Sequence, residues 1–376
     1  MKTKNTILYI GGFLLPDGNA AAQRVIANAK LFSDTGFNVA FLSFSKDLLK
    51  PRTTEYFGFQ CFEFPSTKWS AIAGEDIVRI EEVLNSCSDI SCIAAYNYRS
   101  VSLARLLRLC RKRGIKCIGD VTEWYRARDV SLVKRPFKLI DTGVRMRLLN
   151  PRMDGLIVIS SFLQEYYSSR LPIVLLPPLV DSSEQKWFSS AASKADVTTL
   201  VYAGKPSRTK ERLDLIVEAV VSLPRNINVR LDIVGVTDKE FSDIYDLDVG
   251  SNPRVVFHGR LSHSDALEIV KAADYSIIIR DDNLVTRAGF PTKFAESVTC
   301  GTPVICNKNS DLCLWINKYG CGHMVEEGRL SEGLMGVIAM KRPIFDRGIF
   351  DYRNYRSQTE RFFQDVYKEE GFDAAL

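Results

Sequence analysis

Short apolar runs alternate with helical periodicity along the first half of the chain. Residues 7–10 and 39–44 are apolar runs of strand length, and Ala21, Val25 and Ala29 keep helical spacing between them. Strands that are apolar at every position and alternate with helices are typical of a parallel sheet covered on both faces. The same pattern predicts further strands at 92–96, 115–118, 156–159 and 173–176, and a helix at 103–111.

A second alternating series follows a polar interruption. Pro177 and Pro178 end the first series, and the serine-rich residues 181–199 predict a linker between domains. The pattern then predicts strands at 200–203, 229–234, 255–257, 275–279 and 304–306, and helices at 214–223, 265–272 and 294–300.

Together the two series predict an α/β protein with two Rossmann-like domains, whose parallel sheets face a central cleft. A chain of 376 residues is long for a single core, which agrees with two domains of ordinary size. The first domain is expected at 1–180 and the second at 200–350, with a helix in 351–376 that packs back on the first domain. Ligands of such sheets bind beyond the carboxyl ends of the strands.

The composition is that of a soluble globular protein, with 46% hydrophobic and 25% charged residues. No apolar run reaches the roughly 18–20 residues that span a bilayer, and the N-terminal apolar stretch is short, so we expect a cytoplasmic protein. The nine cysteines include no Cys-x-x-Cys pair, and the three histidines are not closely spaced. We therefore expect reduced, buried thiols and no metal site. We also expect no cofactor, because Gly11, Gly12 and Gly18 do not form the Gly-x-Gly-x-x-Gly fingerprint of a dinucleotide site.

Residues 289–301 combine the features of an anion-binding helix start. Gly289 allows a ligand to approach the backbone, and Pro291 suits the beginning of a helix, whose free N–H groups attract phosphate. Lys293 lies in the first turn, where the helix dipole disfavours a cation unless an anion lies nearby. Glu296, on about the same helix face, is placed to accept hydrogen bonds from two ribose hydroxyls. The alternative is a surface Lys–Glu pair three residues apart.

A second cationic segment follows the first expected strand of the second domain. Gly204 forms a turn there, and Lys205 and Lys210 lie five residues apart before the next helix. That arrangement can direct two cations at a diphosphate, whose charge rises as a sugar leaves. Cations held where charge develops contribute strongly to catalysis. The alternative is a solvated basic loop.

These segments carry a resemblance to the family 4 retaining glycosyltransferases, which extends over almost the full length of the chain. Gly204 and Lys205, followed by Lys210, are similar to the family's diphosphate motif, with lysine in place of the usual arginine. The other segments that resemble family motifs are 16–25, 36–39, 231–235, 256–261, 265–267 and 296–305. The resemblance implies the GT-B fold and retention of the anomeric configuration.

Two positions depart from the family pattern. Ala288 replaces the first glutamate of the family's Glu-x7-Glu motif, which contacts the donor sugar, and Asp281 and Asp282 lie nearby in the sequence as candidate substitutes. The histidine that the family often has after the fourth strand of the first domain is absent, and Thr122 or Glu123 occupies that region.

The resemblance implies transfer of a sugar from a UDP- or GDP-type nucleotide donor to a glycan or polyprenyl-linked acceptor. The catalytic candidates are Lys205 and Lys210, and the donor-binding candidates are Gly204, Arg260, Gly289, Phe290, Thr292, Lys293 and Glu296. The acceptor-side candidates are Gly18, Asn19, Arg24, Asp120 and Glu123. Two alternatives stay open: a non-catalytic GT-B-like binding protein, which the departures favour, and a sugar-nucleotide epimerase.

Cations are concentrated between residues 98 and 154, where fifteen Lys and Arg oppose five acids. A basic surface interleaved with apolar residues is suited to an anionic membrane face. That interpretation agrees with a lipid-linked acceptor and with a peripheral position on the inner face of the membrane. The alternative is a solvated charged face. Nucleic-acid binding is not expected, because the sequence contains no nucleic-acid-binding module.

Overall fold

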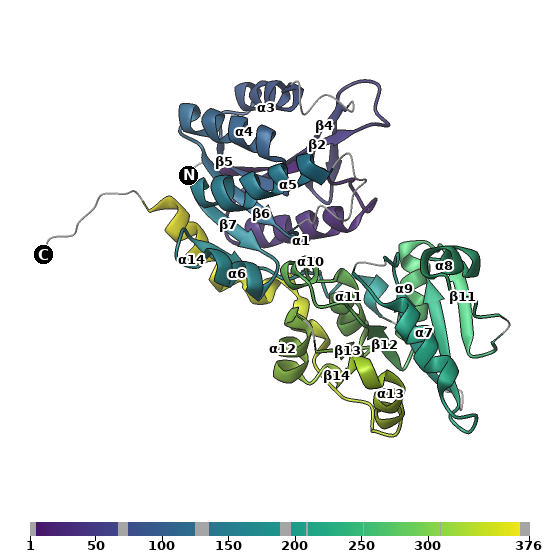
Figure 1. Ribbon diagram of the computed structural model, residues 1–376. Helices are drawn as coiled ribbons and strands as arrows, with labels where there is room; N and C mark the ends of the chain where they lie inside the picture. The colour runs from purple at the N-terminus through teal and green to yellow at the C-terminus, as the bar shows by residue number, and fades with distance from the viewer. Residues whose placement is uncertain are drawn as a thin grey trace, which may run out of the picture. The chain divides into compact units, whose positions relative to one another are not determined.

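A computed structural model describes residues 5–66, 74–124, 135–188, 197–207, 210–250, 252–308 and 310–368. The chain divides into two compact units, drawn in Figure 1. The first unit comprises residues 1–179 and 352–376, and the second comprises residues 180–351. Each unit has its own sheet, and each is described separately below.

The first unit contains an eight-stranded sheet in the order β3-β4-β2-β1-β5-β6-β7-β8. Its strands are β1 (Thr6–Gly11), β2 (Asn38–Ser45), β3 (Arg52–Tyr56), β4 (Phe59–Pro65), β5 (Ile90–Tyr96), β6 (Lys116–Val121), β7 (Gly155–Val158) and β8 (Ile173–Leu175). All neighbours pair in parallel except β3, which pairs antiparallel with β4. The hairpin formed by β3 and β4 was not predicted, because its outer strand is polar and largely exposed.

Helices cover both faces of the first sheet. They are α1 (Ala20–Asp34), α3 (Glu75–Ser86), α4 (Ser100–Arg113), α5 (Arg135–Val144), the π-helical turn η3 (Arg145–Leu149), α6 (Ser161–Tyr167) and α14 (Arg356–Tyr367). Helix α4 contacts α3, α5 and η3, whereas α1 packs with α14, as Figure 1 shows. The last helix of the chain is thus part of the first unit. Its Phe363 ring lies 5.3 Å from that of Phe32 and 4.5 Å from that of Phe37.

In the second unit, a six-stranded parallel sheet has the order β11-β10-β9-β12-β13-β14. Its strands are β9 (Thr198–Ala203), β10 (Val229–Val234), β11 (Val255–Gly259), β12 (Tyr275–Ile278), β13 (Val304–Asn307) and β14 (Gly322–Val325). Its helices are α7 (Leu213–Ser222), α8 (Asp238–Tyr245), α9 (His263–Ala272), α10 (Leu284–Ala288), α11 (Thr292–Cys300), α12 (Ser310–Tyr319) and α13 (Leu330–Ile338). The predicted α/β class with two parallel-sheet domains is therefore confirmed.

The prediction of a linker over 181–199 was too long. Ser182 donates its backbone N–H and its hydroxyl to the Asp351 carboxylate, and Trp187 is buried in a core cluster with Val201 and Leu267. Residues 181–188 therefore pack as part of the second unit, and β9 already begins at Thr198. The serine content suggested solvent exposure, but one buried tryptophan holds the segment in place. Residues 189–196 lie outside the described part of the chain.

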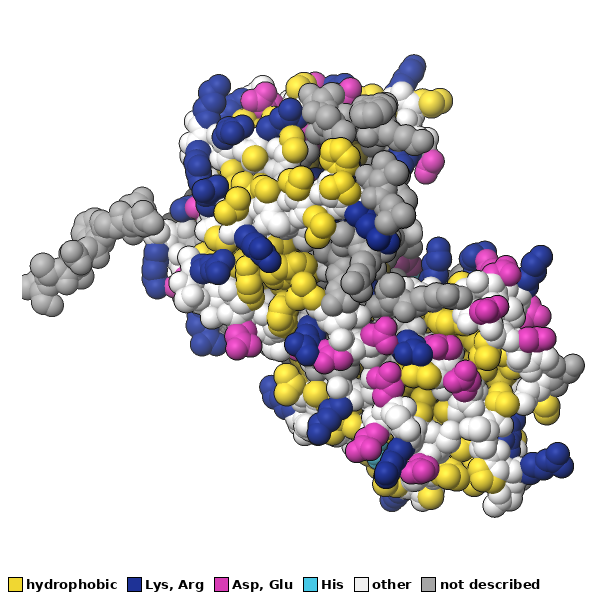
Figure 2. Space-filling view, viewed as in Figure 1, with side chains coloured by type: hydrophobic (Ala, Val, Ile, Leu, Met, Phe, Trp, Pro, Cys, Tyr) yellow, Lys and Arg dark blue, Asp and Glu magenta, His cyan; other side chains and the backbone are white. Residues whose placement is uncertain are grey.

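One helix of the first unit exposes large apolar side chains. Phe137, Leu139 and Ile140 of α5 are 75%, 59% and 64% exposed, and Leu148 of η3 is 51% exposed. Figure 2 shows hydrophobic side chains gathered beside Lys and Arg on this face of the first unit. Within the described ranges, no helix is long and apolar enough to cross a bilayer.

Candidate active site

Glycines occupy the carboxyl ends of neighbouring strands in the second unit. Gly204 follows β9 with φ +143°, and Gly235 follows β10 with φ +106°. The Gly204 N–H donates to the Val234 carbonyl at 2.9 Å, and a Cβ on Gly235 would lie 2.5 Å from the Gly204 carbonyl oxygen. Only glycine fits this close backbone approach. Because these glycines have no side chains, a ligand can reach the main chain at this end of the sheet.

Lys293 of α11 meets this edge. A Cβ on Gly204 would lie 2.8 Å from Lys293 Nζ, so the ammonium group is close to the glycine turn. The Nζ atom forms an ion pair of 2.6 Å with Glu211 Oε2 and lies 4.0 Å from the centre of the Tyr202 ring. The two cationic segments found in the sequence are thus brought together at one place. Their meeting point is the carboxyl end of β9.

Glu211 is a site residue that sequence reasoning missed. It is 8% exposed, its carboxylate accepts a hydrogen bond from the Tyr202 hydroxyl, and its backbone pairs with that of Arg280. Burial alone would raise the pKa of Glu211, but the Lys293 ammonium and the Tyr202 hydroxyl outweigh burial and lower it. The sequence shows only an acid between Lys210 and Arg212, and its partner Lys293 lies 82 residues away.

The two catalytic candidates lie on either side of the residues 208–209, which are outside the described part of the chain. Lys205 is exposed directly after Gly204, and Lys210 is half-buried directly before Glu211. Both therefore belong to the loop that leads from β9 to Glu211. Their contact with a diphosphate stays a prediction.

Arg280 fixes the backbone that leads into α11. This buried residue follows β12, and its guanidinium donates to the carbonyls of Thr286 and Gly289, each at 3.3 Å. The Asn307 side chain in turn holds the Arg280 main chain, with hydrogen bonds of 3.0 and 2.7 Å. Gly289 and the start of α11 are therefore positioned by a buried arginine that no sequence signal singled out.

Helix α11 begins at Thr292, two residues before the predicted range 294–300, and Pro291 is its N-cap. Among the described residues no side chain caps it, so N–H groups of its first turn remain available to an anion. Phe290, by contrast, is 6% exposed, and its ring packs against Phe294 and Trp315. Only the backbone of Phe290 therefore remains a candidate for contact with the donor, because its side chain is part of the core.

The position of the missing family glutamate is buried. Ala288 is 0% exposed at the end of α10. The two aspartates considered as replacements for that glutamate form ion pairs with arginines. Asp281 lies 3.4 Å from the Arg212 guanidinium, and Asp282 binds Arg287 at 2.7 Å. Both aspartates already serve as partners of arginines.

Glu296 lies one turn into α11 and faces α9. Its Oε1 atom is 3.3 Å from Nε2 of His263, and the two side chains are 19% and 26% exposed. This carboxylate is therefore accessible enough to meet a ribose, and an imidazole lies beside it. Arg260 lies beyond β11, is 68% exposed and binds the Glu240 carboxylate. Both residues keep their donor-binding roles as predictions.

In the first unit, Arg24 and Asp120 bind each other instead of facing solvent. They are 4% and 0% exposed, and the Arg24 guanidinium donates to both Asp120 oxygens at 2.8–3.0 Å and to the Leu176 carbonyl at 2.9 Å. The Tyr9 hydroxyl also donates to Asp120. Burial, and then the Asp120 carboxylate, raises the pKa of Tyr9 well above its usual value.

The prediction that Arg24 and Asp120 contact the acceptor is therefore corrected. Their role is structural, because neither side chain reaches the surface. The remaining acceptor-side candidates are accessible. Gly18 is exposed, Asn19 is half-buried and accepts from the Ala22 N–H at 2.9 Å as the N-cap of α1, and Glu123 is half-buried after β6.

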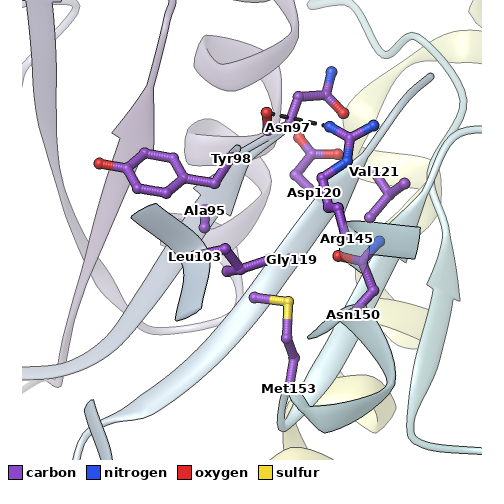
Figure 3. A pocket seen from close by; sticks show the side chains of 10 residues that line it. All are labelled: Ala95, Asn97, Tyr98, Leu103, Gly119, Asp120, Val121, Arg145, Asn150 and Met153. Atoms are coloured by element: carbon purple, nitrogen blue, oxygen red, sulfur yellow. Dashed lines mark hydrogen bonds between the residues drawn. The ribbon is translucent and has the colours of Figure 1, made fainter. Parts of the chain in front are cut away.

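A small cavity lies at the carboxyl ends of β5 and β6, drawn in Figure 3. Its volume is about 10 Å³, which is room for one water molecule and far too little for a sugar. In Figure 3, Arg145 reaches toward Asn97, whose carbonyl accepts from the guanidinium at 3.3 Å. The cavity is a packing feature of the first unit. Over the described residues, no cluster of three or more His, Cys, Asp or Glu could hold a metal ion.

We expect Glu211→Gln to lower the free energy of unfolding by about 2 kcal/mol at pH 7, because a charged hydrogen-bonded pair is lost. The folded-state pKa of Glu211 is depressed. Its contribution is therefore complete above the unfolded pKa, about 4.3, and is lost as the pH falls through the folded-state pKa. Melting curves between pH 7 and 3 should show a shallower acid slope for the variant. The exposed Glu218→Gln is the control, and equal curves for both variants would refute the pair's role.

Comparison with known proteins gives a family match for the second unit and similar folds for the whole chain. Residues 183–340 match the family described as Glycosyl transferases group 1. The structure is similar to sucrose-phosphate synthase from Thermosynechococcus elongatus, with a TM-score of 0.73 and 16% identity over 97% of this chain and 99% of that chain. A comparison with curated proteins found no match.

Two further solved structures are similar. The lipopolysaccharide outer core galactosyltransferase WaaB has a TM-score of 0.62 and 16% identity over 96% of this chain and 98% of its own. HepE from Anabaena, solved with UDP and glucose, has a TM-score of 0.64 and 15% identity over 96% and 99%. At these identities the likeness shows the fold, which is GT-B. The family match over the second unit and the GT-B fold together support a glycosyltransferase enzyme.

Proposed function

We propose that the chain transfers a sugar from a nucleoside diphosphate sugar, with a UDP-sugar as the first candidate. The observation that carries this proposal is the meeting of Lys293 with the Gly204 turn at the carboxyl end of β9, where Lys205 also lies. Cations, a bare glycine edge and the start of a helix are the groups that bind a diphosphate. HepE from Anabaena, which has a similar fold, was solved with UDP and glucose and also with UDP-glucose.

The donor would lie along the carboxyl edge of the second sheet. The pyrophosphate would face Lys205, Lys210 and the first N–H groups of α11, and Glu296 would accept the ribose hydroxyls. Glu211 forms an ion pair with Lys293, so the two residues together add no net charge to the site. Lys293 would therefore act mainly by positioning the other groups of the site. Ala288 contributes no acid to the sugar, so we propose that donor-sugar selection rests on other residues.

For the reaction we propose retention of the anomeric configuration. The acceptor oxygen would form a bond to the anomeric carbon as the bond from that carbon to the phosphate oxygen breaks. The departing phosphate would take the acceptor proton, so no protein base is required. The acceptor would be a glycan or a polyprenyl-linked sugar, contacted by the first unit near Gly18, Asn19 and Glu123.

A nucleotide screen tests the donor proposal. UDP at about 100 times its Kd should raise the Tm by about 5 °C, because only the folded state binds it. UMP is the matched probe, since it has the same base and ribose but lacks the second phosphate. UMP should stabilise less, because the lysines would recognise the diphosphate. GDP in the same screen decides the base. No stabilisation by UDP or by GDP would refute the proposal.

Product analysis separates the two alternatives. A non-catalytic GT-B-like protein that binds a partner or a glycan would bind neither UDP nor GDP and would release no UDP from a UDP-sugar in the presence of acceptors. An epimerase would turn over the donor without any acceptor. A glycine turn with Lys293 beside it and Lys205 directly after it favours a transferase over a pure scaffold, which has no need of a diphosphate site.

A further inference from the structure

Helix α5 is apolar on the side that a surface helix normally keeps polar. Thr142 is its buried residue, at 3% exposure, and marks the side that packs on the first unit. Phe137, Ile140 and Val144 recur at helical spacing on the opposite side, and the first two are 75% and 64% exposed. Packing therefore explains only the Thr142 side. The outward apolar side needs a partner outside the described structure.

Cations surround this apolar side. Helices α4 and α5 and the turn η3 contact one another and carry nine Lys and Arg, of which Arg145 is buried, against a single acid, Asp141. The Asp141 carboxylate is engaged with the backbone N–H and the hydroxyl of Ser100. Arg108 and Arg147 are exposed, as is Val101 on α4 at 54%. Exposed apolar side chains and positive charges therefore form one surface across these three elements.

The positive charge of this surface indicates which kind of partner it binds. A symmetric contact between two copies through this surface would place like charges opposite each other, which is unfavourable. An anionic bilayer offers negative headgroups for the cations and an acyl boundary for Phe137 and Ile140. Hydrophobic insertion and electrostatic attraction would then act on the same face.

We propose that the surface formed by α5, η3 and the outward side of α4 docks on an anionic lipid bilayer. Phe137, Ile140 and Leu148 enter the headgroup boundary, while Arg108 and Arg147 contact lipid phosphates. The helix lies in the plane of the interface and does not cross it. This inference stands on the first unit alone, and it also narrows the proposed acceptor to one that is linked to lipid.

Vesicle flotation with the full chain tests the proposal. The protein should float with vesicles that contain about 30% phosphatidylglycerol in phosphatidylcholine, and not with phosphatidylcholine alone. Phe137→Ser combined with Ile140→Ser should lower the partition coefficient at least about 10-fold. Arg108→Glu combined with Arg147→Glu should do the same, and binding by the unmodified protein should weaken as salt rises.

The matched control is Leu49→Ser combined with Ile344→Ser, two side chains that are 95% and 92% exposed in other places. This control should bind vesicles as the unmodified protein does. Equal flotation of control and patch variants, or no binding to anionic vesicles, would overturn the proposal. So would a dimer that the Phe137 and Ile140 substitutions convert to monomer. Stabilisation by UDP is measured in parallel, so failure of the donor proposal is visible separately.

Discussion

Lys210→Ala is expected to reduce kcat/KM for sugar transfer about 100-fold or more. The reason is that negative charge grows on the β-phosphate as the bond to the sugar breaks, and a fixed cation lowers the free energy of that state most. Lys210 directly precedes Glu211, whose carboxylate is held by Lys293 and Tyr202, so the end of this loop is anchored. Initial rates of UDP release from a UDP-sugar with acceptor measure the effect.

Two further variants make this result specific. Lys210→Arg keeps the charge and should recover a large part of the rate, whereas Lys239→Ala, at an exposed position of α8, should leave it unchanged. The Kd for UDP should weaken less than kcat falls, because the charge on the leaving group is greatest in the transition state. Near-normal turnover of Lys210→Ala would remove this lysine from the mechanism.

Asp120→Asn is expected to lower the free energy of unfolding by about 3–5 kcal/mol, because removing one partner of a buried ion pair leaves the other charge uncompensated. Arg24 is 4% exposed, and Asp120 is the acid that faces its guanidinium. The Asp120 carboxylate also joins β1, α1 and β6 through Tyr9 and Asn28. Urea denaturation followed by circular dichroism measures the loss.

The control for this measurement is Asp365→Asn on α14. Its ion pair with Lys368 is 50–76% exposed, so the change should stay within about 0.5 kcal/mol. Replacing both buried partners, as Arg24→Met with Asp120→Leu, should recover much of the stability, since no lone charge remains. An Asp120→Asn protein as stable as the Asp365→Asn control would return Asp120 to the acceptor-side candidates.

The elements predicted from the sequence are those with strong local signals. Buried parallel strands such as β1 and β10 are apolar at almost every position, and their period separates them from the helices between them. Two of the missed elements have weak signals. Strand β3 is a polar edge strand, and β14 is short and half-exposed, so neither shows a clear apolar pattern.

By itself the sequence determined the two-domain α/β class and the residues at the carboxyl end of β9 and the start of α11. Glycine turns and helix starts are local features, set by a few consecutive residues. Only the tertiary structure decided which charges neutralise each other. Lys293 meets Glu211 across 82 residues, and Arg24 meets Asp120 across 96. The sequence treats each charge as available to a ligand, whereas burial forces it to bind the nearest opposite charge, whatever their separation along the chain.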